Sequence, residues 1–134
     1  MKTDKKVLAS FLAAAVWADG EYDEFEKEFV TDLAGELEIK DLDDVINKEI
    51  AATEKMDEDA IADYLESAAK KVASGEGEGI LTLCLQLMCA DAFLATDEVE
   101  NFFAFAEILG IDEEEASTIL DEYVDEEEDL IIED

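Results

Sequence analysis

The sequence predicts an all-α protein, a single compact bundle of about seven helices. Proline is absent from the 134 residues, and alanine, leucine, glutamate and aspartate dominate the composition. Hydrophobic residues make up 49% of the chain, which is enough for a buried core and argues against disorder. Apolar residues recur at helical spacing. We expect the helices at Thr3–Ala18, Glu24–Leu37, Leu42–Thr53, Glu58–Ser74, Ile80–Asp91, Asp97–Leu109 and Glu113–Glu126.

Residues with capping side chains mark the starts of the first helices. Thr3 or Asp4 can cap the first helix, Asp41 the third and Asp57 the fourth. In the second helix, apolar residues recur at the spacing of one helical face, made of Phe25, Phe29, Val30, Leu33 and Leu37.

The chain divides into two halves, residues 1–74 and 80–126, followed by an acidic tail at 125–134. The glycine-rich Ser74–Gly79 is expected to be a flexible connector, because its two glutamates and lack of Lys or Arg exclude a phosphate loop. The helix after it is apolar on nearly all sides and is expected at the centre of the bundle, whereas the first helix is expected to be amphipathic. The tail is expected to be solvated and loose. The sequence thus predicts one domain of two helical halves.

Carboxylates crowd the first helix junction, Trp17–Glu28 (WADGEYDEFEKE). Gly20 can end the first helix in a left-handed conformation. Asp23 and Glu26, three residues apart, form a capping-box-like pair for the next helix. The stretch therefore predicts an acidic helix–turn–helix corner.

This corner recurs in the second half of the chain. A shift of 72 residues places Ala18-Asp19 on Ala90-Asp91 and Glu26 on Glu98. Apolar positions of the following helix align without a gap, which predicts an internal duplication and two pseudo-repeated halves. The second loop has lost its carboxylates, because Gly20, Glu21 and Asp23 correspond to Ala92, Phe93 and Ala95.

The charge of the chain excludes several classes of function. Forty acidic residues stand against nine lysines, giving a formal net charge of −31, and there is no arginine or histidine. A direct contact with nucleic-acid phosphates or an anionic membrane would need a cationic surface that this composition does not provide. Histidine-based acid/base catalysis and histidine metal ligands are also excluded. We expect no enzyme activity.

Cysteine usage and hydropathy favour the cytoplasm. Cys84 and Cys89 point to different faces of their expected helix, so they predict core thiols rather than a disulfide or a CxxC metal pair. Free thiols are typical of a reducing compartment. The apolar run Val7–Val16 leads straight into the acidic corner, which argues against a secretory signal, and Ile80–Met88 is far too short to span a membrane.

The first corner resembles a known motif. Ala18-Asp19-Gly20-Glu21-Tyr22-Asp23, followed by Glu26, is similar to the ADGEID..E motif of the tellurite-resistance TerB-like family. The likeness extends into the second half, where Leu109-Gly110-Ile111 matches the family's LGI but the second acidic loop is degraded. The resemblance implies an all-helical fold, a bacterial cytoplasmic setting, a link to metal or oxyanion stress, and divalent-cation binding. The residues carried over as metal ligands are Asp19, Glu21, Asp23, Glu26, Asp91 and Glu98.

The acidic corner has the chemistry of a hard-cation site. Asp19, Glu21 and Asp23 have a 1, 3, 5 spacing, and oxygen-only ligands suit Ca²⁺, Mg²⁺ or Mn²⁺. The loop is not an EF-hand, because Glu24 replaces the required glycine and Val30 the bidentate glutamate. In an alternative arrangement, Asp19 and Glu26 of one corner face Asp91 and Glu98 of the other.

Other hypotheses remain open. The same carboxylates can act purely as helix caps and solvated surface. The chain is then an acidic protein–protein interaction module with no specific ion, whose surface or tail binds a basic protein partner. Nucleic-acid mimicry ranks last, because the acids concentrate at helix starts and at the C-terminus. The sequence does not indicate an oligomeric state.

Overall fold

The helix α1 (Lys5–Asp19) lies at the centre of the bundle. In the computed structural model, which describes residues 2–19, 22–90, 93–127 and 130–132, all ten residues from Val7 to Val16 are buried. The helix packs against α3, α4, α5 and α6, and its alanines allow close approach on several sides. The expectation of an amphipathic first helix is therefore wrong, and the centre of the bundle is α1 with α5 beside it.

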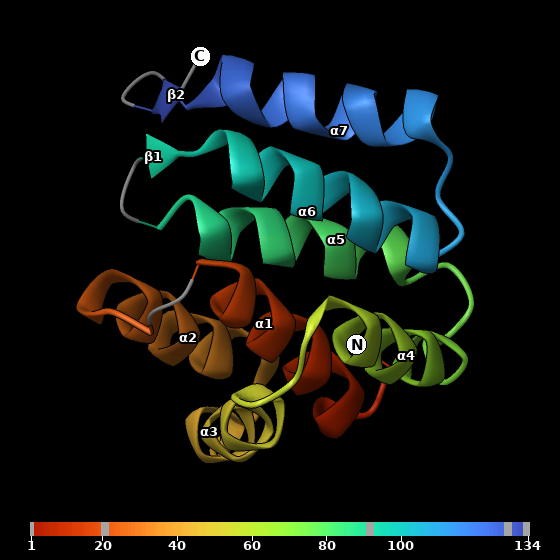
Figure 1. Ribbon diagram of the computed structural model, residues 1–134. Helices are drawn as coiled ribbons and strands as arrows, with labels where there is room; N and C mark the ends of the chain where they lie inside the picture. The colour runs from red at the N-terminus through yellow and green to blue at the C-terminus, as the bar shows by residue number, and fades with distance from the viewer. Residues whose placement is uncertain (1, 20–21, 91–92, 128–129, 133–134) are drawn as a thin grey trace.

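The all-α fold class is confirmed. Three helices match their expected bounds residue for residue: α2 (Glu24–Leu37), α3 (Leu42–Thr53) and α7 (Glu113–Glu126). The others are α4 (Glu58–Ala69), α5 (Gly77–Met88) and α6 (Thr96–Ile108). Figure 1 shows them in layers, with α7 outermost, α6 and α5 beneath it, α1 flanked by α2 and α4 in the next layer, and α3 on the far side.

The connector between the halves is shorter than expected. Helix α4 ends five residues early, at Ala69, and α5 begins at Gly77, so Gly77 and Gly79 lie in its first turn. A tertiary contact fixes this start, because Glu76 accepts hydrogen bonds from the backbone N–H groups of Lys2 and Thr3, both at 2.7 Å. The Thr3 hydroxyl in turn accepts from the Ala73 N–H at 3.0 Å. The N-terminal residues thus tie the connector to the bundle.

Two residues of the expected loose tail are held in a strand pairing. Ile131–Ile132 (β2) pairs in parallel with Phe93–Leu94 (β1), in the register Phe93 to Ile131 and Leu94 to Ile132. This two-residue ladder is the one strand pairing within the described residues, and it holds Ile131–Ile132 beside β1, just before α6.

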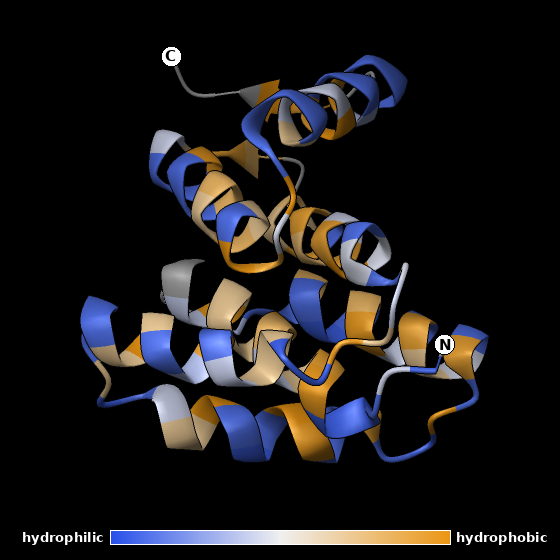
Figure 2. Cartoon of the chain, turned by 90° about the vertical axis from the view of Figure 1, so that its right-hand side faces the viewer, coloured by the Kyte–Doolittle hydropathy of each residue, from blue (hydrophilic) through white to orange (hydrophobic). Residues whose placement is uncertain are grey.

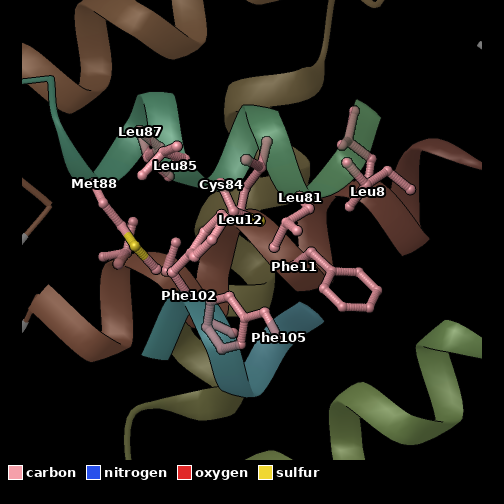
Figure 3. Close-up of a cluster of buried hydrophobic side chains, with 14 of the residues drawn as sticks. Leu8, Phe11, Leu12, Leu81, Cys84, Leu85, Leu87, Met88, Phe102 and Phe105 are labelled. Carbon is pink, nitrogen blue, oxygen red and sulfur yellow. The ribbon is translucent and has the colours of Figure 1, made fainter. Parts of the chain in front are cut away.

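The core is built mainly from α1, α5 and α6. Figure 3 shows Phe11 and Leu12 of α1 beside Leu81 and Cys84 of α5 and Phe102 of α6, all fully buried. The outer helix α7 contributes much less, because Ala116 is its one buried residue, and much of the helix is hydrophilic in Figure 2. None of the described helices has the length and apolar character needed to cross a membrane.

The two halves place their helices at matching positions. Adding 72 to the starts of α1 and α2, residues 5 and 24, gives 77 and 96, which are the starts of α5 and α6. Both second helices end in the same hydrogen-bond pattern. The Ile39 N–H donates to the Ala34 carbonyl at 2.9 Å, and the Ile111 N–H donates to the Ala106 carbonyl at 2.8 Å. The interpretation of this match as an internal duplication stays a prediction.

Candidate functional site

The first acidic corner is organised by a complete capping box. The Asp23 carboxylate accepts from the Glu26 N–H at 2.9 Å, and the Glu26 carboxylate accepts from the Asp23 N–H at 3.0 Å. This reciprocal pair satisfies two backbone donors at the start of α2 and confirms the predicted cap. Glu26 is only 2% exposed, an unusual position for a carboxylate.

Two aromatic residues anchor this corner to the rest of the bundle. The Trp17 indole N–H donates to the Met56 carbonyl at 3.2 Å. The Tyr22 hydroxyl donates to Asp43 of α3 at 2.8 Å, and burial together with this carboxylate raises the Tyr22 pKa. The Lys27 ammonium lies 5.6 Å from the centre of the Tyr22 ring, within range of a cation–π contact. Tyr22 therefore acts as a neutral hydrogen-bond donor that holds the corner against α3.

The second corner has one of the two hydrogen bonds of the capping box. The Glu98 carboxylate accepts from the Ala95 N–H at 2.9 Å, as Glu26 does in the first corner. Ala95 has no side-chain oxygen, so the return bond to the Glu98 N–H cannot form. Glu98 is nevertheless 4% exposed, and both corners therefore bury a glutamate at the third position of their second helix.

The structure brings together only part of the predicted ligand set. Asp23 and Glu26 lie together in one corner, and Glu98 occupies the equivalent place in the other. Glu21, Asp91 and the Asp19 side chain lie outside the described residues. Among the side chains that are described, no three acidic or cysteine residues are grouped to hold a metal. A Ca²⁺ site takes about six to eight oxygen ligands, so the described carboxylates alone do not supply one.

A groove between α2, α5 and α7 is a second candidate site, which the sequence analysis missed. It has a volume of about 470 Å³. On the α2 side an aromatic and aliphatic row, Phe25, Phe29 and Leu33, runs beside an acidic row, Glu28, Asp32 and Glu36. Gln86 of α5 lines it as well, with Cys89 and Ala90 just after that helix, and Tyr123 of α7 and the following Glu127 complete the lining.

The apolar face of α2 is only partly buried, and Phe25 is its exposed end. Phe25 is 58% exposed, the most exposed phenylalanine among the described residues, whereas Val30 and Leu33 are buried. The face is open at this point because α7 packs mainly on α6 and leaves the start of α2 uncovered. The i, i+4 spacing of the two rows was visible in the sequence, but the position of α7 was not.

The groove also contains the Tyr123 hydroxyl, along with the Gln86 amide. Burial, followed by the neighbouring Cys89 and the Glu127 carboxylate, raises the Tyr123 pKa. The hydroxyl is therefore neutral at physiological pH. The acidic residues that line the groove are Glu28, Asp32, Glu36 and Glu127, and no lysine lines it.

Comparison of the chain with protein-family models, curated proteins and solved structures finds no match in any of the three. The resemblance of the first corner to the TerB-like family therefore stays a prediction.

Proposed function

We propose that this protein is a non-enzymatic acidic module that binds a basic protein partner. The observation that carries the proposal is the excess of solvent-facing carboxylates that the chain does not neutralise itself. The formal charge is −31, and within the described residues one ion pair is present, between Lys5 and Asp41 at 2.8 Å. A surface of one sign attracts partners of the opposite sign and speeds their association.

Affinity capture at two salt concentrations tests this proposal. The bait is the full chain in a lysate of the source cells, and the control bait is an unrelated acidic protein of similar net charge. We expect a lysine- or arginine-rich protein to bind this chain in about 0.15 M salt, where screening acts over about 8 Å, and to dissociate at higher salt. Capture of the same proteins by both baits would contradict a specific interaction.

A second candidate function is binding of a divalent cation at the paired corners. The observation that favours it is the burial of Glu26 and Glu98, which carry carboxylates into nearly solvent-free positions at equivalent places. A cation bound between the corners would offset the cost of burying ionised groups. Ca²⁺, Mg²⁺ and Mn²⁺ are the ions that oxygen ligands suit. Such a site would connect the chain to metal or oxyanion stress, as the TerB-like resemblance implies.

Thermal unfolding with each cation, in high monovalent salt, tests the second candidate. A cation at about 100 times its Kd should add about 2.7 kcal/mol to the free energy of unfolding. The paired variant is Asp19→Asn with Glu26→Gln, in which the glutamine still offers an oxygen to the Asp23 N–H. Equal shifts for both proteins, or no shift for either, would contradict a cation site.

A further inference from the structure

The groove between α2, α5 and α7 has the form of a helix-binding site. Its α2 wall extends from Phe25 to Glu36. These residues span roughly 16 Å along the helix axis, at 1.5 Å per residue. A partner helix of about three turns would cover this length. The volume of about 470 Å³ leaves space for its apolar side chains.

We propose that this groove binds a basic amphipathic helix of a protein partner. The inference rests on the proposed function and names its partner surface. In a helix-in-groove complex, apolar residues at i, i+3, i+4 and i+7 enter the groove, and flanking residues contact its rim. Here Phe25, Phe29 and Tyr123 would contact the apolar face of the partner.

Charge on the rim specifies the rest of the partner helix. Glu28, Asp32 and Glu36 are exposed and repeat at i, i+4, so they form a row along one side of the groove. Glu127, directly after α7, adds a further carboxylate. Lysine or arginine residues at i, i+4 on the partner would face this row over its full length. The row therefore selects a helix that is basic on the side next to its apolar stripe.

Other occupants fit this groove less well. A second copy of this chain carries the same −31 charge and would be repelled by the same carboxylates. The Ile131–Ile132 segment of the chain itself is paired with Phe93–Leu94. Nucleic-acid phosphates would face carboxylates with no lysine among the lining residues. A basic helix is the occupant that satisfies both the apolar and the acidic row.

A synthetic peptide tests the inference directly. The probe is a labelled helix of about 14 residues, long enough to cover the wall, with leucines at i, i+3, i+4 and i+7 and lysines at the other positions. Its control is a scrambled peptide of the same composition, which keeps the charge but loses the apolar face. Fluorescence anisotropy in about 0.15 M salt gives both affinities. We expect the amphipathic peptide to bind at least about tenfold more tightly than the scrambled one.

Three variants locate the binding surface. Phe25→Ser removes an exposed ring without touching the core, and we expect it to weaken peptide binding roughly tenfold. The groove variant combines Glu28→Gln, Asp32→Asn and Glu36→Gln. The matched control combines Asp59→Asn, Asp63→Asn and Glu66→Gln, three exposed acids of α4 whose neutralisation changes the net charge by the same amount. We expect the groove variant to weaken binding several times more than the α4 variant.

Specific outcomes would overturn the inference. They are equal affinity of the two peptides, equal weakening by the groove and α4 variants, or no effect of Phe25→Ser. Absence of binding by either peptide would also overturn it. The proposed function fails separately, when the capture experiment gives the same proteins for this chain and for the unrelated acidic bait. A specific basic partner whose capture survives in the groove variant would keep the function and reject the groove.

Discussion

The helices α2 and α6 occupy corresponding positions in the two halves, but they differ in which end has a favourable cap. At its start α2 has Asp23, whose carboxylate accepts from the Glu26 N–H, whereas α6 has Ala95 at the same place. At its end the relation reverses. Glu38 closes α2 in the left-handed conformation, at φ 58°, where a side chain is unfavourable. Gly110, at φ 79°, closes α6 without that cost.

Each helix therefore has one favourable and one unfavourable end, yet the two have nearly the same length. The features that they share are the buried glutamate at the third position and the apolar residues that face the core. Packing and backbone hydrogen bonds thus fix where these helices lie, and the caps adjust how stable they are. Substitutions in the core should consequently change the free energy of unfolding more than substitutions at the caps.

The largest expected effect comes from truncating the core of α6. Phe102 is fully buried between α1 and α5, and Phe102→Ala should reduce the free energy of unfolding by about 3–5 kcal/mol. Its counterpart at the 72-residue shift, Val30, is also fully buried but smaller, and Val30→Ala should cost roughly 2 kcal/mol. Urea unfolding measures both values. An equal or larger cost for Val30→Ala would show that the two halves do not contribute to the core as described.

Substitutions at the two C-terminal caps should change the free energy of unfolding with opposite signs. Glu38→Gly should stabilise the protein by roughly 1 kcal/mol, because glycine adopts the left-handed conformation without a Cβ penalty. Gly110→Ala should destabilise it by about 1–2 kcal/mol. A Cβ built at Gly110 meets nothing within 4 Å, so the cost comes from the backbone conformation alone.

A charge control separates the two causes at Glu38. The carboxylate lies at the negative end of the α2 dipole, so its removal alone stabilises the helix. Glu38→Gln removes the charge and keeps the left-handed side chain. Thermal unfolding should rank the proteins as Glu38→Gly above Glu38→Gln above the native chain. A glutamine variant as stable as the glycine variant would contradict the conformational account.

Substitutions at the N-terminal caps should change the free energy of unfolding by smaller amounts, again with opposite signs in the two helices. Ala95→Ser supplies the missing oxygen on a backbone that is already extended, at φ −79° and ψ 156°, and should add up to about 1 kcal/mol. Asp23→Ala removes the same kind of bond and should cost about 1 kcal/mol. Urea unfolding of the two single variants is the measurement. A loss of stability in Ala95→Ser would mean that the serine side chain does not reach the Glu98 N–H.

Local sequence signals predicted much of this fold. The bounds of α2, α3 and α7 and the Asp23–Glu26 capping box were recognisable because their determinants lie within a few residues of each other. The expected start of α5 lies three residues too late, because the actual start depends on a hydrogen bond between Glu76 and the distant Thr3. The sequence does not predict the central place of α1, because a helix face made of alanines looks like the exposed side of an amphipathic helix.

The candidate sites were predictable to different degrees. Glu26 and Glu98 were identified from the repeat, although their burial was not. The two rows of the groove are recognisable at i, i+4 in α2, but the pattern does not show that Phe25 is exposed. Whether that face is covered depends on where α7 packs, which is a tertiary property without a local signal.

The smallest expected effect concerns the helix starts of α1 and α5. Asp4 accepts from the Lys6 N–H of its own helix at 3.3 Å, whereas Glu76, 72 residues later, accepts from the Thr3 hydroxyl and the Lys2 and Thr3 N–H groups.

These donors, the hydroxyl first, lower the Glu76 pKa below its ordinary value of 4.5. The ionised form is therefore favoured in the folded state, so its contribution is complete above pH 4.5 and is lost as the pH falls through the lower folded-state pKa. Thermal unfolding of the native chain and Glu76→Gln should differ slightly at neutral pH and converge on acidification, because Glu76 is only partly buried and solvent weakens its interactions. A difference that widens below pH 4.5 would contradict this sign and assign Glu76 a role other than an ionised clamp on the N-terminal residues.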